Sequence, residues 1–403
     1  MKILFFSPYF YPYTSGITTY PLKILSYLAK KHEINVLTFR HSKNLWSREK
    51  FQGINIQRMP YIFKISKGFI SPQSVCFFLK QAIKSDLIIL NNPNFEGFIL
   101  ALLAKIFRKK IIAIFHCEVL LGDNIIARII NSTLNSSVYL QLYLSDTIIA
   151  YTKDYIDSIP IGKIFNHKIK YTLPPVERLP INKYKLAEFR KLKGNNIWIG
   201  YAGRFAKEKG LEYLIEAVHN SEFKIQKSCL VFAGPYGKEV AGEEKYYLEI
   251  KKMLGHYGIK HHFFGNLSTG NLGAFYKSID VLVLPSINKT EAFGMVQVEA
   301  MLLGIPVIAS NLPGVRIPIK LTKMGETVEL KNIEQLSTAI MKIIKNKNKY
   351  TNEKIILKTR VIFDINKTNS FYEKLFLKII WLGILFISGY FKNIKGYNIT
   401  WII

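Results

Sequence analysis

The strongest constraint on the fold is a regular alternation of short apolar runs with amphipathic stretches, which occurs twice along the 403 residues. In the first half, the apolar runs predict strands at 3–7, 34–39, 87–90, 111–115, 147–150 and 169–173. The segments between them, such as 17–31, carry apolar residues at helical spacing. Strands that are apolar throughout are buried on both faces, so this pattern predicts a parallel sheet covered by helices on both sides.

The alternation stops at Pro174-Pro175 and the polar stretch 177–196, which is typical of a linker, and then resumes. Further strands are expected at 197–202, 229–233, 261–264, 281–284 and 307–310. We therefore expect an α/β protein with two Rossmann-like, doubly wound domains facing across a cleft, at 1–175 and 176–375. Such sheets bind ligands at the carboxyl ends of their strands, so a cleft between two of them suits a nucleotide-linked substrate.

Composition narrows the function classes only partly. A hydrophobic content of 49% excludes disorder of the whole chain. The net charge of +28 is spread over both halves, and it favours an anionic partner: a phospholipid surface, a nucleic acid or a phosphorylated substrate.

The three cysteines, Cys76, Cys117 and Cys229, lie too far apart for a disulfide framework or a thiolate zinc site, which favours a reducing compartment. The opening run MKILFF ends before Pro8 and predicts a core strand instead of a signal peptide.

The character of the chain changes toward its end. The segment 376–403 belongs to an apolar and basic tail, with Lys378 inside its most apolar stretch and Trp381 and Tyr390 near basic residues. Aromatic and basic residues in this arrangement suit a helix lying on a membrane surface. A terminal helix packed on the protein fits the same pattern, and both interpretations stay open.

The most informative stretch is TEAFGMVQVEAMLLGIPVIAS, residues 290–310. It places Glu291 on a loop and Glu299 on the second turn of a helix that begins near Gly294. Free backbone N–H groups at Phe293, Gly294 and Met295 would suit a diphosphate at the helix N-terminus. Carboxylates on either side can accept hydrogen bonds from sugar hydroxyls. By spacing alone, two solvated surface glutamates would explain the pattern equally well.

Several motifs together resemble one family. Glu291 and Glu299, with AFG and EAM in place, look like the E-x7-E signature of glycosyltransferase family 4, whose members are retaining enzymes of GT-B fold. GYAGRFAKEKG at 200–210 resembles the family's glycine–arginine and lysine–glycine segment, and 231–234 and 264–265 resemble its next strand ends. These matches occur in the family's order and spacing.

The resemblance implies a role for each matching residue. Arg204 and Lys209 would hold the diphosphate of a nucleotide-sugar donor, linked to either GDP or UDP, and would neutralise it without a metal. Glu299 would bind the ribose. Glu291 would bind hydroxyls of the transferred sugar and stabilise its positive charge in the transition state. Phe293, Gly294 and Met295 would contact the donor.

The resemblance also implies roles for two residues of the first domain, His116 and Gly16. His116 ends a predicted strand and matches a histidine that faces the donor sugar in many members, although His-Cys-Glu replaces the common His-Ser-Asp. Gly16 matches a glycine loop after the first strand, where Ser15 replaces the first glycine of the usual pair. A structural histidine and an ordinary strand-to-helix turn are the simpler interpretations of these positions.

The leading hypothesis is a hexosyltransferase that retains the anomeric configuration. It would act on a lipid-linked glycan or glycolipid in surface-polysaccharide assembly, such as lipopolysaccharide, as a cytoplasmic protein peripheral on the inner face of the cell membrane. No D-x-D, HExxH, CxxC or P-loop motif is present, so no metal and no cofactor is expected. The alternatives are a catalytically inactive scaffold, a dinucleotide-dependent oxidoreductase without the G-x-G-x-x-G fingerprint, and a basic nucleic-acid-binding protein without a localised patch.

Overall fold

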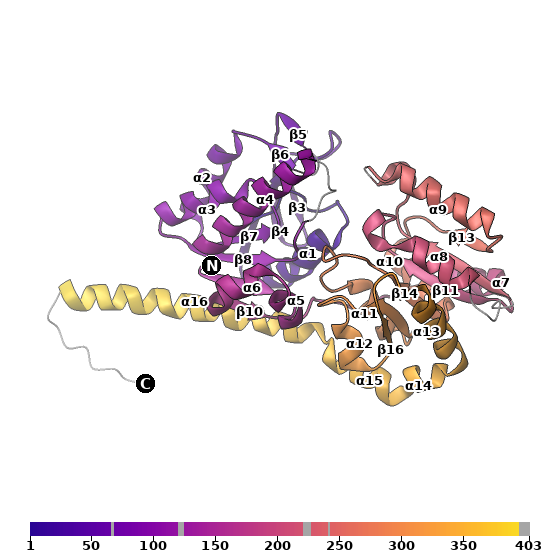
Figure 1. The fold of residues 1–403 in the computed structure, drawn as a ribbon. Helices are drawn as coiled ribbons and strands as arrows, with labels where there is room; N and C mark the ends of the chain where they lie inside the picture. Colours follow the sequence, from indigo (N-terminus) through magenta and orange to yellow (C-terminus); the bar gives the residue numbers. More distant parts are fainter. Residues whose placement is uncertain (66–67, 120–124, 221–226, 241, 395–403) are drawn as a thin grey trace.

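The computed structural model describes every residue except 66–67, 120–124, 221–226, 241 and 395–403. Two parallel sheets, each covered by helices, lie beside one another and are joined by the stretch that follows Tyr171 (Figure 1). The side chains of residues 65, 126 and 380–394 are likewise outside the description.

The first sheet contains eight strands, which are β1 (Lys2–Phe6), β2 (Glu33–Phe39), β3 (Arg48–Phe51), β4 (Ile54–Met59), β7 (Leu87–Asn92), β8 (Lys110–Phe115), β9 (Thr147–Ala150) and β10 (Ile169–Tyr171). Their order is β10-β9-β8-β7-β1-β2-β4-β3, and only β3 runs antiparallel to its neighbour. Ile3 of β1 lies opposite Ile34 of β2 and Leu87 of β7. A separate hairpin consists of β5 (Phe63–Ile65) and β6 (Gly68–Ile70).

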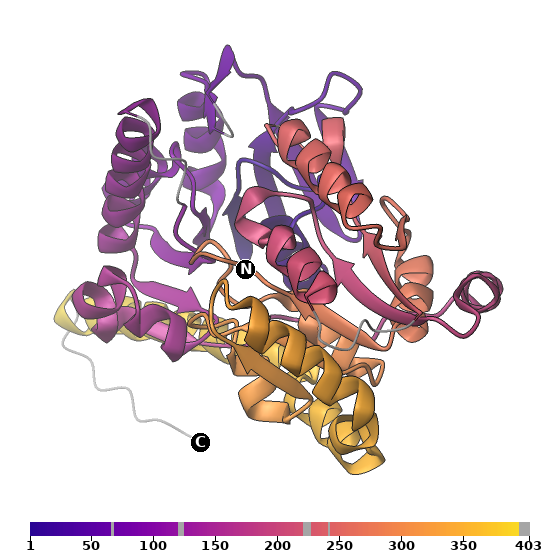
Figure 2. The same cartoon turned by 45° about the vertical axis from the view of Figure 1, so that its right-hand side comes forward.

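Helices cover both faces of this sheet (Figures 1 and 2). They are α1 (Gly16–Leu28), α2 (Ser74–Lys84), α3 (Gly97–Ile106), α4 (Ile125–Leu144), α5 (Lys153–Asp157), α6 (Pro160–Phe165) and the short η1 (Asn166–Lys168). All residues of β7 are buried, as the apolar runs predicted for a sheet covered on both sides.

The second sheet contains six strands, which are β11 (Ile197–Ala202), β12 (Ser228–Ala233), β13 (His261–Phe263), β14 (Val281–Leu284), β15 (Val307–Ser310) and β16 (Gly325–Val328). Their order is β13-β12-β11-β14-β15-β16, and every pair is parallel. The accompanying helices are α7 (Lys183–Lys193), η2 (Lys207–Lys209), α8 (Leu211–His219), η3 (Gly237–Glu239), α9 (Glu244–His256), α10 (Thr269–Ser278), α11 (Met295–Leu302), α12 (Ile317–Thr322), α13 (Ile333–Lys345), α14 (Lys347–Thr351) and α15 (Glu353–Ile362).

The structure corrects the expected linker at 177–196, because much of it is the helix α7. Asn182 caps this helix by accepting hydrogen bonds from the backbone N–H groups of Tyr184 and Lys185. Phe189 is fully buried, and its ring packs against Phe264 with a centroid distance of 4.7 Å. A single buried aromatic anchors the otherwise polar helix, so its sequence looked like a linker.

The final helix, α16 (Ile365–Ile394), returns to the first domain (Figure 1). Tyr372, Leu375 and Phe376 are buried in the core of the first sheet, and the Tyr372 hydroxyl lies 2.7 Å from that of Tyr20 in α1. The expected division placed 176–375 in the second domain, whereas this stretch of the helix packs on the first. Within the described residues, no helix has the length and apolarity needed to span a bilayer. Residues 395–403 and the side chains of Trp381 and Tyr390 lie outside the described residues.

Replacing Tyr372 with alanine should destabilise the first domain, because it removes a fully buried ring and leaves the Tyr20 hydroxyl without its partner. We expect a loss of about 3–5 kcal/mol in the free energy of unfolding, the usual cost of truncating a buried aromatic. Urea unfolding followed by circular dichroism measures it. Leu377→Ala is the matched control, since Leu377 on the same helix is 55% exposed. Equal unfolding midpoints for the two variants would contradict the packing of α16.

Candidate functional site

The loop after β14 leads into α11 and contains Glu291, Phe293 and Gly294. Gly294 has φ of 73°, and a Cβ there would lie 2.5 Å from Leu284 Cδ2, so the position requires glycine. Within the described part of the chain, the backbone N–H groups of Phe293, Gly294 and Met295 donate no hydrogen bond. These unpaired donors at the start of α11 form a site suited to an anion.

Gln297 holds this loop in place, although the sequence did not mark it as a site residue. Its side-chain Nε2 donates to the backbone carbonyls of Phe293 at 2.9 Å and Val315 at 3.0 Å. The side chain is fully buried, which makes these hydrogen bonds hard for water to replace. The loop therefore presents its N–H groups from a fixed position.

Lys209 and Glu291 form an ion pair in which Nζ lies 2.6 Å from Oε2. Both side chains are mostly buried, at 15% and 16% exposure. Lys209 ends η2, and the backbone N–H of Ile287 donates to the Glu208 carbonyl at 3.0 Å, which ties η2 to the segment before Glu291. Two residues 82 positions apart are thus held together beside the unpaired N–H groups.

Arg204 lies in the same region but pairs with Glu208 instead of Glu291. Its side chain is 38% exposed. A guanidinium has five N–H donors, so the ion pair with Glu208 leaves others for a second anion.

Glu299 projects from the second turn of α11 and accepts a hydrogen bond of 2.9 Å from the hydroxyl of Tyr276. Burial raises the pKa of its carboxyl, while the hydrogen bond from Tyr276 and the charge of Lys23 act in the opposite direction. Lys23 belongs to α1 of the first domain, whereas Tyr276 belongs to α10 of the second.

Contacts between the two domains bring the predicted residues into one region. A Cβ on Gly16 would lie 3.3 Å from Met295 Cε, so α1 begins directly against the α11 loop. The Tyr155 hydroxyl accepts from the Glu118 backbone N–H at 2.9 Å and donates to the Lys289 carbonyl at 2.8 Å. This tyrosine links the segment after β8 to the segment before Glu291.

The Cys117 thiol lies at the end of β8, in the electrostatic field of the charged site residues. Burial raises the pKa of its thiol to about 12, and the charges of Glu291, Lys209 and Arg204 also act on it. Burial is the main cause of this shift, and the charges of the second domain act on it in both directions.

His116 is turned into the first domain. Its Nε2 lies 2.6 Å from Asn91 Oδ1, and its Nδ1 contacts the Tyr151 hydroxyl. Asn91 donates through Nδ2 to the Ile17 carbonyl, so its Oδ1 accepts from Nε2–H and the imidazole accepts from Tyr151 through Nδ1. Burial lowers the pKa of His116 to about 3, which keeps the ring neutral. In this arrangement neither ring nitrogen is available to a substrate, and the predicted contact of His116 with the donor sugar stays a prediction.

Of the predicted residues, Lys209, Glu291, Phe293, Gly294 and Met295 form one contiguous group, with Gly16 against it. Four side chains that the sequence reasoning missed hold the group and its surroundings, namely Asn91, Tyr151, Tyr155 and Gln297. Asn91, Tyr151 and Tyr155 have partners on other segments of the chain, so no local spacing could have identified them. Gln297 has one local partner, Phe293, four residues before it, and one distant partner, Val315.

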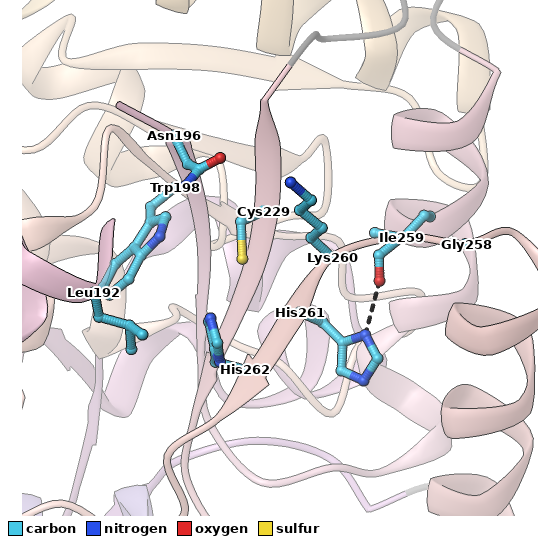
Figure 3. Close-up of a pocket in the computed structure, with 9 residues that line it drawn as sticks. All are labelled: Leu192, Asn196, Trp198, Cys229, Gly258, Ile259, Lys260, His261 and His262. Carbon is cyan, nitrogen blue, oxygen red and sulfur yellow. Dashed lines mark hydrogen bonds between the residues drawn. The ribbon is translucent and has the colours of Figure 1, made fainter. Parts of the chain in front are cut away.

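A hollow of about 410 Å³ lies elsewhere, at the amino ends of β11, β12 and β13 (Figure 3). Trp198, Cys229 and His262 line it, and His261 hydrogen-bonds through Nδ1 to the Ile259 carbonyl at 2.8 Å. It is at the opposite end of the sheet from the Glu291 loop. Among the described residues, no group of His, Cys, Asp or Glu side chains could hold a metal ion.

The burial of His116 should make stability sensitive to acid. Its folded-state pKa is lowered below the unfolded value of roughly 6.5, so the unfolded state binds the proton more readily. The neutral, buried His116 therefore makes its full contribution to the free energy of unfolding above pH 6.5. As the pH falls from 6.5 toward 3, the free energy of unfolding decreases by at most about 1.4 kcal/mol per pH unit.

Comparing wild type with His116→Gln isolates this effect. We expect the difference between their unfolding free energies to shrink as the pH falls from 7 to 4, measured by urea unfolding at each pH. His219→Gln is the control, because this histidine lies at the end of α8 outside the network. A difference that is constant over this range would mean that His116 is not buried in its neutral form.

The sequence of this chain is similar to those of known glycosyltransferases. Residues 183–358 match the family described as glycosyl transferases group 1. An uncharacterized glycosyltransferase of Methanocaldococcus jannaschii is 26% identical over 78% of this chain and 80% of its own. The capsular polysaccharide biosynthesis glycosyltransferase CapM of Staphylococcus aureus is 27% identical over 54% of this chain and 59% of its own.

Solved structures agree on the fold. The Anabaena protein Alr3699/HepE, crystallised with UDP and glucose, superimposes with a TM-score of 0.76 at 18% identity, over 93% of this chain and 99% of its own. The expected GT-B fold, with two parallel-sheet Rossmann-like domains, is confirmed. Over residues 183–358, which include Arg204, Lys209, Glu291 and Glu299, this GT-B chain matches the group 1 glycosyltransferases.

Proposed function

We propose that this chain is a retaining glycosyltransferase that moves a hexosyl unit from a nucleoside-diphosphate sugar to a hydroxyl of a lipid-linked glycan or glycolipid. The observation that carries the proposal is the Lys209–Glu291 ion pair beside the unpaired N–H groups of residues 293–295. It combines a cation and backbone donors for phosphate with a carboxylate for sugar hydroxyls. The match to group 1 glycosyltransferases and the CapM relative support surface-polysaccharide assembly as the setting.

The donor would lie with its diphosphate against the start of α11. Lys209 uses one of its three N–H donors on Glu291, so two remain for phosphate oxygens. Arg204 would add a second cation, and Glu299 would accept hydrogen bonds from the ribose. The structural neighbour bound to UDP supports a uridine donor, while guanosine remains the alternative to be tested.

Catalysis would depend on stabilising charge at two places. Lys209, Arg204 and the backbone N–H groups would stabilise the departing diphosphate, and Glu291 would stabilise the positive charge that develops on the sugar. The acceptor hydroxyl would attack from the face that the diphosphate leaves, with a diphosphate oxygen taking its proton. This route retains the anomeric configuration and requires no metal and no protein nucleophile.

We place the protein in the cytoplasm, on the inner face of the cell membrane. The net charge of +28 supports attraction to an anionic surface, where each nearby Lys or Arg contributes about 1 kcal/mol. On the described part of α16, Lys374 and Lys378 are exposed. A scaffold without catalytic activity is the alternative, and the absence of donor binding would favour it.

The donor site can be tested by thermal shift with UDP, GDP and their sugar conjugates. A ligand at a hundred times its Kd should stabilise the protein by about 2.7 kcal/mol. Lys209→Ala and Glu299→Ala should each reduce the shift, because they remove a phosphate contact and a ribose contact. Glu249→Ala, on the exposed face of α9, should leave it unchanged. No shift with any nucleotide would overturn the transferase proposal.

The role of Glu291 can be separated from donor binding. Glu291→Gln should lower the rate of nucleoside-diphosphate release from the matching donor by about 10²–10³-fold, the usual cost of losing one charge that stabilises a transition state. Its thermal shift with the nucleoside diphosphate should persist. Proton NMR of the sugar released by wild type to water should show the donor's anomeric configuration before mutarotation. An inverted product would contradict retention.

A further inference from the structure

Aromatic side chains gather at the carboxyl end of the first sheet, next to the site described above. The ring of Tyr9 lies 4.6 Å from that of Tyr13, 5.7 Å from His41 and 4.9 Å from Phe69, measured between centroids. The ring of Tyr61 also packs on Phe69, with a centroid distance of 4.8 Å. These five residues come from the loop after β1, the end of β2, the end of β4 and the hairpin strand β6, and we call them the aromatic cluster.

The aromatic cluster is partly exposed and carries one cation. Tyr13 is 41% exposed. Lys64 Nζ lies 5.4 Å from the centroid of Tyr9 and 5.7 Å from that of Phe69. Aromatic faces attract groups with partial positive charge, which include the C–H groups on one face of a pyranose ring. A sugar could therefore stack on Tyr13 while an anionic group attached to it reached Lys64.

Two exposed apolar residues lie next to Lys64 in the chain. Ile62 and Phe63 directly precede Lys64 and are 68% and 50% exposed. The backbone N–H of Ile62 donates to the Ile70 carbonyl at 2.9 Å, so these residues belong to the folded hairpin. Two exposed apolar side chains, one aliphatic and one aromatic, therefore precede the positive charge of Lys64 in the chain.

A buried carboxylate supports the cluster from within. Glu96 Oε1 accepts from the Phe69 backbone N–H at 2.7 Å, and its Oε2 is buried without a partner among the described residues. Burial raises the pKa of this carboxyl. Glu96 thus fixes Phe69, and Phe69 in turn fixes Tyr9, so Glu96 acts as a positioning residue.

The cluster is close to the donor loop. Tyr13 is three residues from Gly16, which spans at most about 11 Å of chain. Gly16 lies against Met295 at the start of α11. The Thr18 hydroxyl donates to the Tyr13 carbonyl at 2.7 Å, which fixes the loop between them. A sugar on Tyr13 would be within reach of a donor sugar held near Glu291.

We propose that the aromatic cluster and Lys64 form the acceptor subsite, and that the acceptor is a pyranose linked through phosphate to a hydrocarbon chain. The sugar stacks on Tyr13, the phosphate pairs with Lys64, and the hydrocarbon lies on Ile62 and Phe63. The assignment rests on the proposed function, which it extends by naming the residues that hold the acceptor.

Binding without a donor tests the subsite directly. We would titrate the full chain with the α-1-phosphates of glucose, mannose and galactose by saturation-transfer NMR, and with the decyl phosphodiester of the epimer that binds. Lys64→Gln should weaken binding by on the order of tenfold, the usual value of one charge-assisted contact. Tyr13→Ala should weaken it by about fivefold to tenfold, because it removes the stacking face. Tyr13→Phe should restore it, because the ring face remains.

The chain contains a matched control. Lys168 Nζ lies 5.4 Å from the ring centroid of Tyr143, a similar pair at the amino end of the same sheet, so Tyr143→Ala and Lys168→Gln should leave binding unchanged. Lys209→Ala should also retain it. Binding lost in Lys209→Ala but kept in Tyr13→Ala would place the probe in the donor site and overturn the proposal.

Simpler probes test each part of the acceptor. Equal binding of methyl glycosides without phosphate, or of inorganic phosphate alone, would overturn the combined recognition of ring and phosphate. Equal affinity of the decyl ester and the free sugar phosphate would overturn the assignment to a lipid-borne acceptor. Donor binding by thermal shift is independent of these outcomes, so failure of this subsite and failure of the proposed function are distinguishable.

Discussion

The interface between the two domains determines the geometry of the candidate site. Arg316 forms a bidentate ion pair with Asp154 of α5, with N–O distances of 2.7 and 2.9 Å, and Asp154 also accepts from the Gly314 backbone N–H. Lys289 donates to the Ser158 carbonyl at 2.6 Å. Along the sequence, Lys289 precedes Glu291, whereas Gly314 and Arg316 follow it, so these contacts flank the Glu291 loop. A carboxylate paired with a guanidinium in this way is directional, so it fixes the angle between the surfaces as well as their separation.

At the same interface, buried hydrogen bonds and aromatic packing together hold the site residues in position. Tyr151 contacts His116 through its hydroxyl, while its ring packs at 6.0 Å from that of Phe293 in the second domain. Tyr20 packs on both His116 and Tyr151 and hydrogen-bonds to Tyr372 of α16. A continuous network therefore joins the end of β8, the start of the chain, the donor loop and the last described helix. Loss of one member would leave another buried polar group unpaired.

The parts of the fold that the sequence predicted well are those with a local physical cause. Strands such as 147–150 and 281–284 match β9 and β14 because residues buried on both faces must be apolar. The strands β3, β4 and β16 were missed, since their sequences mix polar with apolar residues and each strand is partly exposed. The helix α7 was missed for a related reason: its buried residue Phe189 is surrounded by charged neighbours.

The sequence by itself determined the repeated α/β architecture and the local chemistry of the Glu291 loop, because helix starts, glycine conformations and apolar strands depend on neighbouring residues. Only the tertiary structure decided which distant residues meet. It paired Lys209 with Glu291, turned His116 toward Asn91 and Tyr151, and returned α16 to the first domain. Such contacts depend on the shape of the whole molecule, since each joins segments whose separation along the chain carries no information about their distance in space.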